Sequence, residues 1–306
     1  MEEMMVDILI RACFFLLLVI LGYVMKKAGI LSKGDGVALA RVVLNITLPC
    51  AILVSFKTFV FEWTYMMIPL ISFAANWLML GWGYLLSKRG SREDRIFYML
   101  EMPAYNIGNF TLPFVSGILG STGVVATCLF DMGNSPMCLG LNFIITALVL
   151  GENPGRSPLK SVLSIFKKPS FTVYFIMLML SIFSIKLPDV VFDFAGLVSP
   201  ANGPLAMIMI GLMLEFSSEK SKLKEVVTVN ICRLLLAGVI GLLFFAFTPF
   251  PYEVRKAVAI TAFSPISSAS PAFVSELKGD VELVGFASTV SIVISLVLMP
   301  LLFALI

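Results

Sequence analysis

The sequence predicts an all-α integral membrane protein whose ten transmembrane helices form two inverted five-helix repeats. Composition is the first reason, because 59% of the 306 residues are hydrophobic and 13% are charged, against about 25% charged in soluble domains. The second is segment length, because a bilayer core about 30 Å thick requires roughly 20 apolar residues. Ten segments approach this length, at residues 8–28, 36–56, 64–87, 96–119, 123–150, 171–185, 194–216, 226–248, 254–277 and 281–306. Short motifs that recur in both halves are the third reason.

Composition also excludes several classes of protein. The net charge of +3 is small and the basic residues are dispersed among loops, so we expect no nucleic-acid partner. The five cysteines lie in apolar segments without CxxC spacing, which argues against disulfides and a zinc site. The sequence has no histidine, so imidazole cannot serve as metal ligand or general base. We therefore expect neither an enzyme nor a resident cofactor or metal.

Basic residues in the loops predict the orientation of the chain. Short cytoplasmic loops collect Lys and Arg. With the N-terminus outside, the cytoplasmic loops hold 15 basic residues: Lys26, Lys27, Lys33, Lys88, Arg89, Arg92, Arg95, Arg156, Lys160, Lys167, Lys168, Lys220, Lys222, Lys224 and Lys278. The opposite side holds four, namely Lys57, Lys186, Arg255 and Lys256. We expect a multi-pass protein of the cell membrane with both termini on the non-cytoplasmic side.

The predicted domains are two halves, residues 1–150 and 170–306, joined by a cytoplasmic linker over residues 151–169. Apolar residues recur at helical spacing in this linker, beside several lysines, at Leu159, Val162, Leu163 and Phe166. This pattern predicts a short amphipathic helix on the inner leaflet.

Matches between the halves predict the internal repeat. The pattern FVSxxxG at residues 114–120 recurs 159 residues later, at residues 273–279. Pro49 and Pro204 match in the same order, at an offset of 155. Because each half has an odd number of spans, the second half enters the membrane from the opposite side. Inverted repeats with broken helices are common in secondary transporters, whose sites lie at the midplane between the halves.

Two segments, 96–119 and 254–277, combine prolines with polar side chains at membrane depth. Proline removes a backbone donor and interrupts a helix. Broken backbone in a membrane is tolerated where it is buried in protein or lines a wet cavity. We therefore predict one substrate cavity between the breaks, where helix N-termini favour an anion. The predicted substrate-binding residues are Asn45, Asn106, Asn109, Thr111, Pro113, Ser267, Ser268, Pro265 and Pro271. The alternative is that the prolines only kink helices and the polar groups only join helix pairs.

Asp131 and Asn134 lie one turn apart near the middle of segment 123–150. An ionisable carboxyl at this depth is costly and is a functional candidate by default. Asp131 is therefore predicted either to bind a coupling cation or proton, or to pair with a buried arginine. Among the arginines, we expect Arg233 to extend toward the membrane surface.

Arg41 and Asn45 lie one turn apart on the second predicted span, ahead of Pro49. Arg41 is a candidate guide for the anion. Asn45 precedes Pro49 by four residues, which places its amide near a backbone carbonyl that the proline leaves free. A purely structural role for Asn45 is an equal alternative.

Six motifs, spread over essentially the whole chain, carry a family resemblance. They are LGYVMKKAGIL, LNITLPCAIL, NIGNFTLPFVSGILG, KKPSF, ANGPLAMIMIGLMLEF and SPISSASPAFVSELKGD. The pattern resembles the auxin efflux carrier family, and its bacterial members of the malate or malonate permease kind. The resemblance implies ten-helix anion carriers with crossing, proline-broken fourth and ninth helices. The family's asparagine falls on Asn106, and its crossover prolines fall on Pro113 and on Pro265 or Pro271.

Two positions depart from the family pattern. Thr111 stands where a glycine is common, and Asn109 where an apolar residue is common. Both changes favour a substrate more polar than an aromatic acid.

The leading hypothesis is secondary transport of a small organic anion, an auxin-like or malate-like mono- or dicarboxylate, by alternating access. Spans 3–5 and 8–10 would move against a panel of spans 1, 2, 6 and 7. A sodium-coupled symporter of the bile-acid type is the nearest alternative, and a non-transporting membrane sensor or scaffold is another. Coupling to H⁺ or Na⁺ and assembly into a homodimer are left open.

Overall fold

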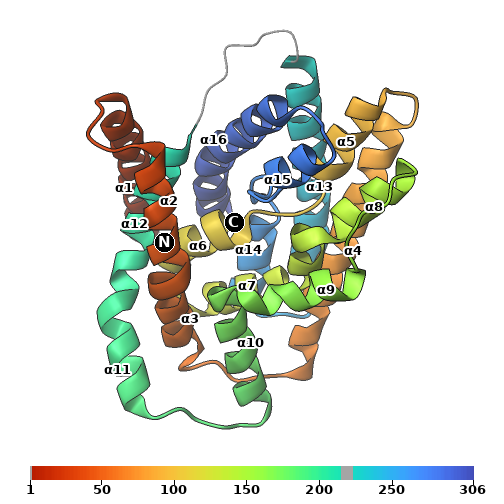
Figure 1. Ribbon diagram of the computed structural model, residues 1–306. Helices are drawn as coiled ribbons and strands as arrows, with labels where there is room; N and C mark the ends of the chain where they lie inside the picture. The colour runs from red at the N-terminus through yellow and green to blue at the C-terminus, as the bar shows by residue number, and fades with distance from the viewer. Residues whose placement is uncertain (1, 215–222) are drawn as a thin grey trace.

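The computed structural model describes residues 2–214 and 223–306, and it is built of helices joined by short connections (Figure 1). The first half comprises α1 (Glu2–Lys27), α2 (Lys33–Val42), η1 (Val43–Thr47), α3 (Leu48–Phe56), η2 (Trp63–Met66), α4 (Met67–Ser87), α5 (Arg92–Glu101), η3 (Ile107–Thr111), α6 (Leu112–Ile118), α7 (Gly120–Pro136), η4 (Met137–Leu141) and α8 (Asn142–Val149). The remainder comprises α9 (Pro158–Leu163), η5 (Ser164–Lys167), α10 (Pro169–Ile182), α11 (Asp189–Val198), η6 (Ser199–Ala201), α12 (Asn202–Met213), α13 (Leu223–Phe247), α14 (Tyr252–Thr261), α15 (Ser270–Glu276) and α16 (Val281–Leu305). The predicted end of the seventh span, residues 215–216, and the loop residues Lys220 and Lys222 lie outside the described residues.

Several of these helices have the length and apolarity of membrane spans. Within the described residues there are six, at Lys33–Phe56, Trp63–Ser87, Gly120–Val149, Asp189–Met213, Leu223–Phe247 and Val281–Leu305. A seventh candidate is the pair Pro158–Lys167 and Pro169–Ile182, which is bent by 87°. The expected class, an all-helical membrane protein, is confirmed, while the number of ten spans stays a prediction.

The outer surface of the bundle is apolar, as a lipid-facing surface must be. Leu70, Leu235, Leu242 and Leu305 are each more than 60% exposed, and they come from α4, α13 and α16. Soluble monomers rarely expose contiguous apolar patches of more than a few hundred Å². Exposed leucines on long helices therefore indicate contact with lipid tails.

Prolines are accommodated by widened helical turns. Pro49 and Pro113 each lie at the first turn of an α-helix, directly after the π-helical turns η1 and η3. In both places the backbone N–H that precedes the proline bonds five residues back, from Leu48 to Val43 and from Leu112 to Ile107. A missing proline donor is thus accommodated by a local shift of the hydrogen-bond register.

Glycines allow two pairs of helices to approach closely. A Cβ atom on Gly22 of α1 would lie 2.3 Å from the Ile208 carbonyl oxygen of α12, and one on Gly211 would lie 2.1 Å from that of Val19. On α7, a Cβ atom on Gly133 would lie 2.0 Å from the Pro69 carbonyl oxygen of α4. Small residues are the usual means of close helix packing in membranes. Figure 1 shows α1, α2 and α12 together on one side, and α4, α5 and α8 on the other.

The linker contains a helix where the sequence predicts one. α9 and η5 together cover residues 158–167, and Leu159, Leu163 and Phe166 are exposed while Ile165 is buried. In Figure 1 this segment runs across the front of the bundle, and α10 continues from its end. Its placement on the inner leaflet stays a prediction.

Candidate functional site

Two broken helices cross at the centre of the bundle. The first break joins α5 to η3 over residues 102–106, and the second joins α14 to α15 over residues 262–269. Tyr105 and Ile266 form an isolated antiparallel β-bridge between the two breaks. The Asn106 N–H donates to the Pro265 carbonyl oxygen at 2.9 Å. Both predicted interruptions are therefore present, and their extended segments pair with each other.

Side chains from neighbouring helices satisfy the free backbone groups of the first break. Asn76 of α4 accepts from the Ala104 N–H at 2.7 Å. Asn134 of α7 accepts from the Tyr105 N–H at 2.8 Å and donates to the Tyr105 carbonyl at 3.0 Å. Because an unpaired backbone group in a membrane is costly, these amides are what allow the helix to open here.

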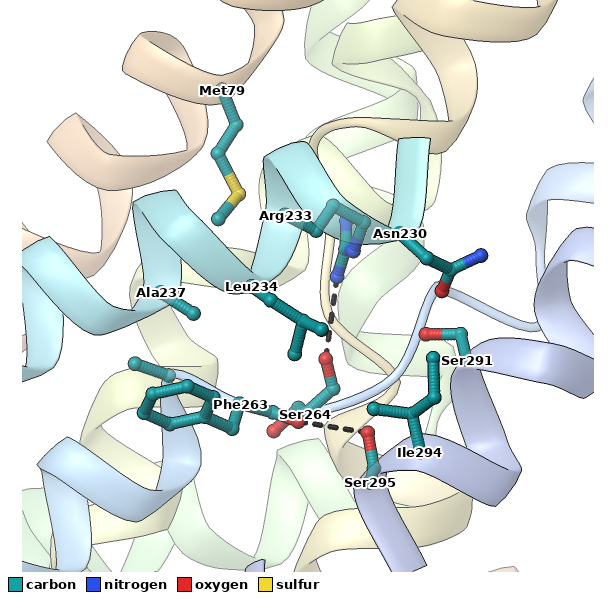
Figure 2. Close-up of a pocket in the computed structure, with 11 residues that line it drawn as sticks. Met79, Asn230, Arg233, Leu234, Ala237, Phe263, Ser264, Ser291, Ile294 and Ser295 are labelled. Carbon is teal, nitrogen blue, oxygen red and sulfur yellow. Dashed lines mark hydrogen bonds between the residues drawn. The ribbon is translucent and has the colours of Figure 1, made fainter. Parts of the chain in front are cut away.

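Hydroxyl groups of α16 perform the same task for the second break. The Ile266 N–H donates to Ser291 Oγ at 3.1 Å, and Ser295 Oγ donates to the Phe263 carbonyl at 2.8 Å. Figure 2 shows both serines pointing from α16 toward the segment that carries Phe263 and Ser264.

Arg233 of α13 holds both breaks together. Its guanidinium donates to five carbonyl oxygens. They belong to Glu101 at the end of α5, to Met102, Pro103 and Ala104 in the first break, and to Ser264 in the second. Arg233 is 5% exposed, and its guanidinium lies over the Tyr105 ring, 5.4 Å from the ring centre. Figure 2 shows the side chain reaching from α13 toward Ser264. A cation suits this place, because the carbonyl ends of broken helices carry partial negative charge. The prediction that Arg233 extends to the membrane surface is therefore wrong.

The predicted polar residues meet across the crossing. Asn109 Nδ2 donates to Ser268 Oγ, and Thr111 Oγ1 donates to Ser264 Oγ at 2.7 Å. Ser267 Oγ lies 3.0 Å from Cys138 Sγ and is buried. Thr111 and Ser267 thus serve the packing of the crossing, while Asn109 and Ser268 remain reachable from outside it.

The three predicted prolines occupy different places. Pro113 and Pro271 lie in the first turns of α6 and α15, where a missing N–H costs little. Pro265 lies inside the second break and accepts the hydrogen bond from Asn106. All three shape the backbone, and none of them lines the cavity beside the crossing.

A cavity of about 210 Å³ lies beside the first break. The first turn of η3 borders it through Ile107, Gly108 and Asn109, preceded by Asn106. Its other polar lining residues are Asn45, Asp131, Ser135, Cys138, Lys167, Lys168, Ser170 and Ser268. Asn106 is only 7% exposed. The cavity therefore combines amides, hydroxyls, one carboxyl and two ammonium groups at the end of a helix that points its N–H groups inward.

Asp131 lies on the wall of this cavity and is held by neutral donors. Its carboxylate accepts from Asn134 Nδ2 at 3.0 Å and from the Tyr174 hydroxyl at 3.0 Å. Lys168 is the cation close enough to influence it. The sequence left open whether Asp131 binds a coupling ion or pairs with a buried arginine. In the described part of the chain, no arginine pairs with its carboxylate.

Asn45 reaches the cavity and Arg41 does not. Arg41 is exposed and lies outside the cavity lining. The Asn45 amide donates to the Arg41 carbonyl oxygen at 2.6 Å, one turn before it. This differs from the expected contact with the carbonyl that Pro49 frees, because the π-helical turn η1 shifts the register of the intervening backbone.

Sequence analysis missed several residues of this region. Arg233 and Glu101 lie in apolar segments near span ends, where polar side chains usually reach for the interface, and Asn76 lies in the middle of α4. Lys167 and Lys168 were expected to mark only a cytoplasmic loop. The one signal that could have pointed to Asn76 and Arg233 is that each is a polar residue opposite a predicted break. Using that signal requires knowing which helices surround the break.

Comparison with known proteins is consistent with this arrangement. Residues 8–305 match the family described as Membrane transport protein. A relative from Methanothermobacter thermautotrophicus, described as an uncharacterized transporter, is 27% identical over 295 residues and covers 94% of each chain. The family match includes the two breaks, the linker and every residue that lines the cavity.

Proposed function

Because the chain belongs to the Membrane transport protein family, that of the auxin efflux carriers, we propose that it moves a small organic anion across the membrane by alternating access. As a member of this family it is a multi-pass membrane transporter and not an enzyme. Membership in a family of transporters also disfavours the alternative of a non-transporting sensor or scaffold. The observation that carries the substrate class is the polar cavity beside the crossing.

The chemistry of the cavity suits a small carboxylate. Lys167 and Lys168 outnumber Asp131, so the lining carries an excess of positive charge. The first turn of η3 adds unpaired N–H groups, which favour a negative ligand. A volume of about 210 Å³ is below the roughly 300–1,000 Å³ of sites for drug-sized ligands. A mono- or dicarboxylate of the malate type fits these limits better than a large aromatic acid.

Contacts between positions that match in the two halves support the inverted ten-helix repeat of residues 1–150 and 170–306. Thr47 Oγ1 donates to Asn202 Oδ1 at 3.0 Å, and these positions differ by 155, the offset of Pro49 and Pro204. Asn109 and Ser268 differ by 159, as do Asn106 and Pro265, which is the offset of the FVSxxxG motifs. In a two-fold arrangement, residues near the axis contact their own counterparts.

The cavity location suggests which state the structure represents. Residues 167–171, at the end of the linker, form one wall of the cavity. Since the charge bias places the linker in the cytoplasm, with both termini outside, this is the cytoplasm-facing state. The moving part then comprises α4–α8 and α13–α16, and the static panel comprises α1–α3 and α10–α12, through which a homodimer would form.

The crossing disfavours the sodium-coupled alternative. Oxygen atoms freed by broken helices are the ligands that a coupling Na⁺ would use. Here five such carbonyl oxygens already accept from the Arg233 guanidinium. A fixed cation in this position leaves little for a second one to bind.

Flux of labelled carboxylates into proteoliposomes tests the proposal. We expect saturable uptake of a small carboxylate by the parent protein without a sodium requirement. Asn106→Ala removes a cavity donor to the anion, so uptake at low substrate concentration should fall about 10- to 100-fold, the effect of losing a hydrogen bond to a charged group. Asn153→Ala is the matched control, because Asn153 is an exposed asparagine of the linker outside the cavity.

Two results would contradict the proposal. If the parent moves no mono- or dicarboxylate, the substrate class is wrong. If Asn106→Ala and Asn153→Ala behave alike in folded protein, the site is wrong.

A further inference from the structure

Glu101 is a fully buried carboxyl that the proposed anion site does not use. It is the last residue of α5, it is 0% exposed, and it does not line the cavity beside Asn106. Its Oε1 atom contacts the hydroxyl of Ser270, the first residue of α15. Its Oε2 atom is buried and has no hydrogen-bond partner among the described residues. One carboxyl therefore joins the two crossing helices through a single hydroxyl.

The groups that face Glu101 are one cation and two hydroxyls. Arg233 approaches from α13, Ser270 from α15 and Ser288 from α16. The Ser288 hydroxyl is buried and also without a hydrogen-bond partner among the described residues. No other charged group influences this carboxyl in the described part of the chain.

Arg233 does not pair with the carboxyl beside it. The guanidinium donates to the backbone carbonyl of Glu101 at 3.0 Å, and to four others, but to neither carboxyl oxygen. In a membrane interior, attraction between a guanidinium and an ionised carboxylate is much stronger than attraction to neutral carbonyls. An ionised Glu101 so close to Arg233 would draw it into an ion pair. The absence of an ion pair between these neighbours is the arrangement expected of a neutral carboxyl.

We propose that Glu101 is a proton-binding site of this carrier, protonated in the conformation observed here and ionised at another stage of the transport cycle. This inference rests on the proposed transport function. Loss of the proton leaves a carboxylate that attracts the Arg233 guanidinium away from part of its carbonyl set. Those carbonyls belong to the break that carries Asn106 at its other end. The proton thereby controls the geometry of the crossing, beside the anion cavity.

Asp131 provides the internal comparison. Its carboxylate accepts two hydrogen bonds from neutral donors and has Lys168 nearby, all of which stabilise the ionised form. Glu101 also has a cation nearby, Arg233, but it accepts one hydrogen bond and has an unpartnered oxygen. Of the two buried carboxyls, Glu101 is thus the one whose ionised form has less support from hydrogen bonds.

The first test measures proton-driven accumulation in proteoliposomes, with the membrane potential held at zero by K⁺ and valinomycin. The substrate is the carboxylate that the parent exchanges at equilibrium. A gradient of one pH unit, acid outside, supports about tenfold accumulation if one proton accompanies each substrate. We expect this in the parent and in Glu93→Gln, which changes an exposed glutamate at the start of the same helix, outside the cavity. Glu101→Gln should retain equilibrium exchange within about threefold and accumulate no substrate above the external concentration.

The second test does not depend on transport. Infrared spectra of the purified protein at neutral pH should contain the carbonyl band of a buried carboxylic acid. That band should be absent from Glu101→Gln and present in Asp131→Asn. Glu101→Asp keeps the carboxyl and covers the case in which the glutamine variant does not fold.

Several outcomes would overturn the proposal. These are a parent that exchanges substrate but ignores the pH gradient, proton-driven accumulation that persists in Glu101→Gln, or a parent spectrum without the acid band. Accumulation driven by Na⁺ and lost in Glu101→Gln would identify a sodium site instead. A parent with the acid band but no carboxylate flux would refute the transport proposal and leave the protonated Glu101 in place.

Discussion

The two breaks meet at one point, but different chemistry holds each of them. Amides hold the first, through Asn76 and Asn134. Hydroxyls of one helix hold the second, through Ser291 and Ser295. An amide both donates and accepts, so Asn134 satisfies the N–H and the carbonyl of a single residue, whereas each serine satisfies one backbone group.

The two breaks also differ in what they contribute to the lining of the cavity. The first break and η3 contribute Asn106 and Asn109 to the lining, and the second break contributes Ser268 alone. A binding group is useful only if its backbone is held in place. The break that bears most of the proposed binding groups is also the one fixed from three helices, α4, α7 and α13.

The largest expected effect comes from Arg233, which both breaks share. Arg233→Met removes the donor to five carbonyl oxygens, and each buried acceptor left unpaired costs about 1–3 kcal/mol. We expect a clearly lower Tm in detergent and no carboxylate flux. Arg233→Lys keeps the charge but loses the fork of donors, so its Tm and its carboxylate flux should lie between those of the parent and those of Arg233→Met. An unchanged Tm in Arg233→Met would show that the carbonyls do not require this cation.

A second substitution pair sharpens the comparison between the breaks. Asn134→Ala leaves two buried backbone groups of Tyr105 unpaired, so the free energy of unfolding should fall by about 2–4 kcal/mol. Ser291→Ala leaves one, the Ile266 N–H, and should cost about 1–2 kcal/mol. Chemical denaturation of the purified variants in the same detergent measures both. Equal losses would mean that the two breaks are held equally.

The smallest effect is expected at the rim of the cavity. Lys168→Gln removes an exposed charge, so the apparent affinity for a carboxylate should weaken about two- to threefold at low salt. The difference should disappear at high ionic strength, because exposed charges are screened. Lys160→Gln, on the same linker but outside the cavity, is the control. A salt-independent loss in Lys168→Gln would place this lysine in direct contact with the anion.

The sequence predicted those parts of the site that depend on local chemistry. Proline spacing located both breaks, and the polar residues near them included Asn106, Asn109 and Ser268, which the structure brings together. Roles that depend on another helix were not predictable in this way. Arg233 is buried because free carbonyls from two distant segments surround it. The sequence of its own span contains no sign of these contacts. Lys167 and Lys168 line the cavity because the linker turns by 87° into α10, a tertiary feature.

The Arg233 guanidinium rests on neutral carbonyl oxygens, so it amounts to an uncompensated positive charge within the bundle. When the crossing shifts through part of the bilayer, this charge shifts through the same fraction of the electrical potential. A full traverse corresponds to about 2.3 kcal/mol at 100 mV. If transport proceeds by such a shift, we expect its rate to depend on the membrane potential.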